Sequence, residues 1–114
     1  MAVLPGDCKI NLASLAMTLG CGNCRLATEK EVRSLFPESE VGAMPPFGGA
    51  SGMPVYIDLH LFEEPYMVFN AGTHRDAIHI SVGDYVRLTN PTMVRFAYPT
   101  PVLGRTEGIS HAAI

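Results

Sequence analysis

The amino-acid sequence predicts a single α+β domain. Short apolar runs typical of strands are interspersed with helical segments, without the regular spacing of βαβ units. A chain of 114 residues has the length of one domain. Hydrophobic residues make up 47 % of it, which is enough for a core and argues against disorder.

The N-terminal part predicts a strand, a turn and a helix. Residues 2–4 are apolar and are followed by Pro5-Gly6-Asp7, a sequence typical of a turn. Asn11 has the character of a helix N-cap and Gly20 that of a C-cap. The side chains between them that recur at helical spacing are Leu12, Leu15, Ala16 and Leu19.

A second helix is predicted after a brief strand at residues 25–27. Thr28 and Glu31 have the spacing of a capping box, in which each side chain accepts a hydrogen bond from the other residue's backbone amide. The helix must end near Pro37 because proline disfavours a helical conformation in the residue before it. Its inward-facing residues are expected to be Val32, Leu35 and Phe36.

Residues 42–52 form an uncharged stretch with four glycines and two prolines, where neither helix nor strand is expected. Such a stretch is either a flexible linker or a loop packed against a ligand or a neighbouring element. We favour a binding loop, because functional residues concentrate on loops that a rigid scaffold holds.

The second half of the chain predicts more strands, a short helical turn and a third helix. Ser81 begins that helix and Asn90-Pro91 ends it. We therefore expect a domain over residues 1–91 and an irregular C-terminal tail over residues 92–114, which show no periodicity. The expected strands are residues 54–58, 66–69 and 77–80, with the helical turn at 59–64.

The charge balance excludes one class of function. Eight lysines and arginines against eleven acidic residues give a net charge of −3. Such a chain does not hold nucleic acid by bulk charge, so contact with RNA requires a local patch or a second protein.

The cysteine count and the N-terminal sequence predict a soluble, cytoplasmic protein. Three cysteines are too few, and odd in number, for a secreted disulfide framework. The first residues do not have the basic and apolar regions of a signal peptide. No stretch approaches the roughly 18 apolar residues that a membrane span needs.

Residues 66–74 contain the most informative candidate site. A strand ends in Ala71-Gly72, and a hydroxyl and an imidazole, Thr73 and His74, follow at once. Glycine permits a tight turn and close approach of a ligand, and histidine suits proton transfer near neutral pH. From the pattern alone, we favour the alternative that His74 is a turn residue bonded to a backbone carbonyl.

Cys21 and Cys24 have the C-x-x-C spacing of thiol redox proteins and of half a zinc site. The redox motif depends on a helix N-terminus, whereas this pair follows a predicted helix, where the dipole disfavours a thiolate. The chain has no second pair to complete a zinc site. We therefore interpret both as incidental turn thiols.

The other histidines and Asp58 carry weaker signals. His60, His79 and His111 are not expected to be ligands, and Asp58 is expected to cap the turn that follows it. No serine-hydrolase elbow, phosphate-binding loop or paired-carboxylate motif is present, and no metal or cofactor is implied.

Several segments together resemble the YbaK/EbsC family, the aminoacyl-tRNA deacylase domain that also occurs within, or associated with, prolyl-tRNA synthetase. The resemblance covers residues 2–91 in unbroken order. Its motifs are Leu4-Pro5-Gly6-Asp7, Leu26-Ala27-Thr28-Glu29-Lys30-Glu31-Val32, Leu35-Phe36-Pro37, Val41-Gly42-Ala43-Met44-Pro45-Pro46-Phe47-Gly48, Gly52-Met53-Pro54-Val55-Tyr56-Ile57-Asp58, Phe69-Asn70-Ala71-Gly72-Thr73-His74 and Tyr85-Val86-Arg87-Leu88.

The resemblance implies a curved mixed β-sheet with short helices, and hydrolysis of the ester joining a wrong amino acid to the 3′ end of a tRNA. Water attacks the ester in this family, without a conventional nucleophile. It also implies a catalytic group made of His74, Gly72 and Thr73. The substrate-binding positions it implies are Gly42, Pro46, Phe47, Gly48 and Asn70.

One departure from the family concerns a lysine. Family members carry further strands before the Val3-Leu4-Pro5 strand, and these hold a lysine associated with binding the tRNA end and with catalysis. Neither Lys9 nor Lys30 matches that position. The chain is therefore either a natural short form or one whose start was placed late, and its edge strand is expected to pair with a second copy in a homodimer.

Two functions follow from the resemblance. The first is deacylation of mischarged tRNA by a hydrolase that contacts the tRNA acceptor end, with or without a tRNA synthetase as partner. The alternative is a non-catalytic module that binds an aminoacyl-tRNA end, a small ligand or a synthetase. The missing lysine is the feature that separates them, and the amino acid removed is not evident from the sequence.

Overall fold

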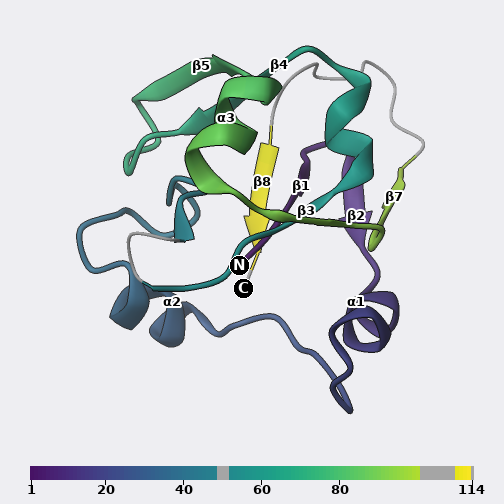
Figure 1. Cartoon of the computed structure of the whole chain (residues 1–114). Coiled ribbons are helices and arrows are strands. Elements are labelled where there is room, and N and C mark those ends of the chain that lie inside the picture. The colour runs from purple at the N-terminus through teal and green to yellow at the C-terminus, as the bar shows by residue number, and fades with distance from the viewer. Residues whose placement is uncertain (49–51, 101–109, 114) are drawn as a thin grey trace.

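The computed structural model describes residues 1–48, 52–100 and 110–113 (Figure 1). Strands and short helices are interspersed along the chain, as the α+β prediction requires. The elements are β1 (Ala2–Pro5), β2 (Cys8–Ile10), α1 (Leu12–Leu19), α2 (Glu29–Leu35), β3 (Tyr56–Asp58), the 3₁₀ helix η2 (Leu59–Glu63), β4 (Tyr66–Asn70), β5 (Ala77–Ser81), α3 (Val82–Thr89), β6 (Thr92–Val94), β7 (Ala97–Pro99) and β8 (Ser110–Ala113).

A mixed sheet of four strands, in the order β6-β3-β1-β8, forms the centre of the fold (Figure 1). β1 is parallel to β3 and antiparallel to β8, and β3 is parallel to β6. Two antiparallel pairs, β2–β7 and β4–β5, flank this sheet. The expected α+β class with a mixed sheet is therefore confirmed.

The two faces of β1 contact two different hydrophobic clusters, because successive strand residues point to opposite sides of a sheet. Val3 packs in the larger cluster, which includes Met67, Phe69 and Tyr85 from β4 and α3. Ala2 and Leu4 pack on the other side. Their cluster includes Leu15 of α1 and Phe96.

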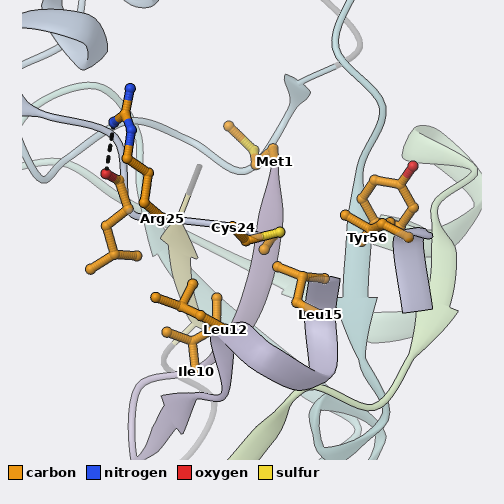
Figure 2. A pocket seen from close by; sticks show the side chains of 10 residues that line it. Met1, Ile10, Leu12, Leu15, Cys24, Arg25 and Tyr56 are labelled. Carbon is orange, nitrogen blue, oxygen red and sulfur yellow. Dashed lines mark hydrogen bonds between the residues drawn. The ribbon is translucent and has the colours of Figure 1, made fainter. Parts of the chain in front are cut away.

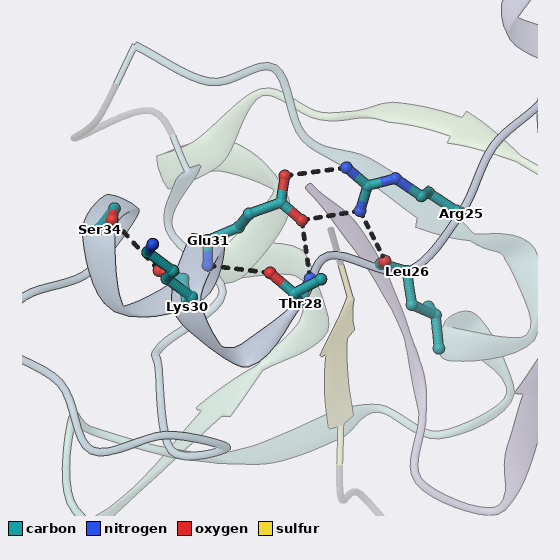
Figure 3. Close-up of polar contacts among 6 residues, drawn as sticks. All are labelled: Arg25, Leu26, Thr28, Lys30, Glu31 and Ser34. Atoms are coloured by element: carbon teal, nitrogen blue, oxygen red, sulfur yellow. Dashed lines mark hydrogen bonds and ion pairs between the residues drawn. The ribbon is translucent and has the colours of Figure 1, made fainter.

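The helix ends confirm the predicted caps. The side chain of Asn11 accepts a hydrogen bond from Ser14 N, and Gly20 ends α1 in the left-handed conformation. Thr28 and Glu31 form the capping box of α2, in which each side chain accepts from the other's amide (Figure 3). Ser81 caps α3.

Two sequence predictions of secondary structure were wrong, and one strand was missed. Residues 25–27 form no strand, because Arg25 and Thr28 instead bind Glu31 at the start of α2. The strand β2 was not predicted. The tail from residue 92 was expected to be irregular, yet its described residues include β6, β7 and β8, each paired with an earlier strand.

The pairing of β8 changes the expectation for the sheet edge. The sequence predicted that β1 would lie at an open edge. In the structure β1 lies between β3 and β8, with Ala2 opposite Ala113 and Pro5 opposite Ser110. The chain's own C-terminal strand therefore occupies the edge where a second copy was expected.

In the part of the chain that is described, no helix is long and apolar enough to cross a membrane.

Candidate functional site

The glycine- and proline-rich loop and the Gly-Thr-His turn lie against each other. Gly72 N donates a hydrogen bond of 2.9 Å to Ala43 O, and Glu40 N donates one of 2.7 Å to Gly72 O. Both backbone groups of Gly72 are therefore bound to the segment that opens the loop. These two bonds fix the distance between segments about 30 residues apart in sequence.

Gly42 and Gly72 adopt conformations that favour glycine. Their φ angles are +82° and +97°, in the region where a Cβ atom clashes with the backbone. A Cβ on Gly42 would lie 3.5 Å from His74 Cε1, and one on Gly72 would lie 3.6 Å from Ser39 Oγ. Both distances are ordinary van der Waals separations, so a Cβ atom would fit at either position. The backbone conformation is therefore the main reason for glycine there.

His74 is exposed, and its ring binds the loop. Its Nε2 atom lies 2.8 Å from the carbonyl oxygen of Val41. A carbonyl only accepts, so Nε2 must carry the proton, and in the neutral ring Nδ1 keeps its lone pair. The prediction of a turn histidine bonded to a backbone carbonyl is confirmed. That carbonyl belongs to the loop, so the bond also joins two parts of the candidate site.

Thr73 stabilises the turn through its hydroxyl. Its Oγ1 donates to Asp76 Oδ2 at 2.5 Å and accepts from the amides of Arg75 and Asp76 at 3.3 and 3.1 Å. Asn70 is the half-buried last residue of β4 and pairs with Ala77 across the hairpin. Thr73 directly precedes His74 in the turn, and Asn70 ends the strand that leads into it. Their roles toward a substrate stay predictions.

The later residues of the loop face the core. Pro46 is fully buried, and Phe47 packs edge-on against Phe69 at 5.3 Å between ring centres. A Cβ on Gly48 would come within 3.1 Å of Met53 O and of Val55 Cγ2, so the backbone itself packs there. These three residues hold the loop on the domain, and their predicted contact with a substrate stays a prediction.

Tyr85 of α3 anchors the loop, a role that no sequence pattern indicated. Its hydroxyl donates a buried hydrogen bond of 2.7 Å to Pro46 O. Burial raises the pKa of the Tyr85 phenol, so the hydroxyl stays protonated at neutral pH. The sequence pattern identified Tyr85 only as a helix residue that packs inward.

Asp58 caps the turn that follows it, as predicted, and also binds the segment after β6. Its buried carboxylate accepts from His60 N at 2.8 Å and from the amides of Phe96 and Ala97 at 2.8 and 2.9 Å. His60 Nδ1 lies 2.6 Å from the same carboxylate. Burial raises the pKa of Asp58, but the hydrogen bonds together outweigh it and hold the pKa below its usual value.

The structure also has an apolar pocket of about 170 Å³, and none of its lining residues belongs to the loop or the turn (Figure 2). Its lining comes from α1, β1, β2, β3 and the segment between α1 and α2, and includes Leu15, Cys24 and Tyr56. Lys9 lies on β2 and Lys30 on α2, so neither belongs to the loop or to the turn. The structure thus brings together Gly42, Gly72 and His74, with Thr73 beside them.

The sequence is similar to that of known tRNA-editing proteins. The family model described as aminoacyl-tRNA editing domain matches residues 1–88. The multifunctional Ser/Thr-tRNA deacylase ProXp-y of Escherichia coli K12 is 32 % identical over 97 residues, which are 84 % of this chain and 58 % of that protein. The same protein of E. coli O157:H7 matches equally.

Two solved structures share the fold at 22 % identity. One, from work on grafting linear epitopes onto scaffold proteins, has a TM-score of 0.71 and matches 82 % of this chain and 61 % of its own. The crystal structure of hypothetical protein APE2540 has a TM-score of 0.74 and matches 85 % of this chain and 65 % of its own. The chain spans less than two thirds of the length of each of these relatives.

Proposed function

This chain belongs to the family of aminoacyl-tRNA editing domains, and on that basis we propose that it hydrolyses the ester of mischarged aminoacyl-tRNA. The observation that supports the proposal is the bond between His74 and the loop at Val41. The bond keeps the exposed imidazole of His74 close to Gly42 of the loop, as a hydrolytic site on this turn would require.

In the proposed mechanism, His74 positions or deprotonates the water that attacks the ester carbonyl. The amides of Ala71 and Gly72 already donate to Asp76 O and Ala43 O, so they are not free to hold a developing oxyanion. We therefore assign that role to the amides of Thr73 and His74, further along the turn. Gly42 lets the loop approach the imidazole, and an uncharged loop suits a small amino-acid side chain.

The acidic character of the chain bears on how tRNA is held. A net charge of −3 gives little general attraction to a polyanion. We infer that the domain contacts only the acceptor end, in the cytoplasm where tRNA is charged, and that a synthetase or a further part of the protein supplies the remaining contacts. A homodimer stays a prediction that light scattering tests, although β8 now occupies the edge on which it was based.

The test is incubation of the purified chain with a panel of mischarged tRNAs. Seryl- and threonyl-tRNA come first because a relative is a Ser/Thr-tRNA deacylase. Alanyl- and cysteinyl-tRNA(Pro) follow, beside a His74→Ala variant. We expect loss of ester with the wild-type chain and a large reduction in the variant.

The same experiment tests the alternative, a non-catalytic module. Neither Lys9 nor Lys30 lies on the elements that form the site, which is the observation that favours this alternative. Decay at the background rate for both proteins, together with saturable binding of an aminoacylated acceptor-stem RNA, would establish binding without catalysis.

A further inference from the structure

Two thiols outside the candidate site lie close together. The Sγ atoms of Cys21 and Cys24 are 3.5 Å apart, within the range of a sulfur hydrogen bond, and both residues are free cysteines. The spacing alone suggested incidental turn thiols. The short distance between their sulfur atoms is an observation that the sequence did not contain.

The end of α1 fixes the position of Cys21. Gly20 has a φ of +72° and its amide donates to Met17 O, while Cys21 N donates to Ala16 O at 3.0 Å. This pair of bonds is a Schellman motif, which ends a helix in one defined conformation. The Sγ of Cys21 also lies 3.6 Å from Ala16 O, so the carbonyl group that binds the Cys21 amide also binds its thiol.

The start of α2 and the smaller hydrophobic cluster fix the position of Cys24. Its side chain packs against that cluster and lines the apolar pocket (Figure 2). The next residue, Arg25, makes two hydrogen bonds to Glu31, of 2.7 and 2.9 Å (Figure 3). Both ends of the four-residue segment are therefore anchored, and the fold itself holds the two sulfur atoms together.

The environment of the pair in the described residues differs from that of two known uses of this spacing. Across the described part of the chain, no three His, Cys, Asp or Glu side chains gather as metal ligands, so the pair lacks the partners of a zinc site. The hydrogen bond with Cys21 raises the pKa of the Cys24 thiol, and the carbonyl end of a helix disfavours a thiolate. A fast catalytic dithiol requires the opposite.

We propose that Cys21 and Cys24 are a reversible dithiol–disulfide site whose oxidant is a hydroperoxide. The exposed Cys21 attacks the peroxide oxygen, which leaves a sulfenic acid on Cys21 and releases water or an alcohol. Cys24 then attacks the Cys21 sulfur, and the sulfenic oxygen departs as water. The two thiols lose two protons and two electrons in total, and these reduce the O–O bond of the peroxide.

Oxidation of this site requires little movement and leaves the candidate editing site in place. Closing the sulfur atoms from 3.5 Å to a bond of about 2 Å is a side-chain rotation. Cys24 packs with Ala2 and Leu4, on the opposite face of β1 from the cluster below the loop and turn. The oxidised chain is therefore expected to keep any deacylase activity within about twofold.

Trypsin separates the cysteines in a way that makes the test direct. Cleavage after Lys9 and Arg25 gives a peptide of residues 1–9 with Cys8 and a peptide of residues 10–25 with both Cys21 and Cys24. After treatment with hydrogen peroxide and then an alkylating reagent, the second peptide should carry no alkyl group. Its mass should be two hydrogens below that of the same peptide with two free thiols. Reduction with dithiothreitol should restore two alkylation sites. Cys8, in the first peptide, is the internal control.

Two variants and one side reaction complete the design. In Cys24→Ser, peroxide should leave Cys21 as a sulfenic acid that a dimedone probe traps, whereas in Cys8→Ser the disulfide should form as in the wild type. Met17 is 84 % exposed and gains an oxygen, which dithiothreitol does not remove. The proposal is overturned if Cys21 and Cys24 alkylate as fully as Cys8 after peroxide, or if they form disulfides only between chains.

Discussion

His74 Nε2 lies 2.8 Å from the carbonyl oxygen of Val41, so one hydrogen bond joins the Gly-Thr-His turn to the start of the glycine- and proline-rich loop. The imidazole therefore has two separable tasks. Its Nε2–H binds the loop, and Nδ1 is the nitrogen to which we assign the proposed chemistry. A substitution that keeps the first task and removes the second distinguishes them.

The His74→Gln variant separates these two tasks. A glutamine amide still donates a hydrogen bond toward Val41 O but offers no basic nitrogen. We expect kcat for deacylation to fall by about 10² or more, with the thermal unfolding midpoint unchanged. If His74→Gln retains the wild-type rate while His74→Ala loses it, the imidazole only anchors the loop.

The Gly72→Ala variant tests the backbone of the turn. A φ of +97° strains any residue with a Cβ, so we expect the free energy of unfolding to fall by about 1–2 kcal/mol. Gly83→Ala is the matched control, because Gly83 lies within α3 with open space around it. That variant should gain about 0.5–1 kcal/mol. Urea denaturation of both variants tests whether the free energy of unfolding falls in Gly72→Ala and rises in Gly83→Ala.

The Tyr85→Phe variant removes the hydroxyl that holds the loop and leaves Pro46 O buried without this donor. We expect a loss of about 1–3 kcal/mol in the free energy of unfolding, with an increase in KM for aminoacyl-tRNA as the loop loosens. Tyr66→Phe, at an exposed tyrosine on β4, should change stability by less than about 0.5 kcal/mol. Equal effects of the two variants would argue against the anchoring role.

Glu31 makes the stability of the start of α2 sensitive to acid. The hydrogen bond from Arg25, with those from Thr28, lowers the pKa of Glu31 to about 2 from a usual value of 4.5. A lowered pKa means that the stabilisation is complete above the usual value and is lost as pH falls toward about 2. In Arg25→Met this part of the acid dependence should shrink. Urea midpoints measured between neutral pH and pH 2 test this, and identical curves for the two proteins would contradict it.

The sequence predicted the parts of the fold that local chemistry determines. Asn11, Gly20 and the capping box from Thr28 each act within one helical turn, and each is confirmed. The pairings of β6, β7 and β8 depend on partners far away in the sequence, so the tail showed no local signal. A strand of three or four residues is too short to show periodicity.

Local residue types also predicted one part of the candidate site, whereas another part depends on contacts between residues far apart in the sequence. The Gly72-Thr73-His74 turn was recognisable because the residue types themselves suggest a turn and an imidazole. Tyr85 and the Val41 carbonyl were not recognisable, because a buried hydroxyl bond over 39 residues and a backbone acceptor leave no mark in the sequence. The second half of the loop was expected to bind substrate, and its packing against the core depends on this distant tyrosine.

The Asp58→Asn variant tests how the segment after β6 is held. The buried carboxylate accepts three backbone hydrogen bonds, from His60, Phe96 and Ala97. An asparagine keeps one oxygen and turns an N–H₂ group toward an N–H donor, so we expect a loss of about 2–3 kcal/mol. Because the pKa of Asp58 is lowered, this stability is present above its usual value and is lost as pH falls through the lowered value. Relative to the wild type, the variant should therefore lose more free energy of unfolding at pH 7 than at pH 3. Exposed Glu38→Gln is the control, and an equal loss for Asp58→Asn at both pH values would show that the charge of Asp58 does not matter.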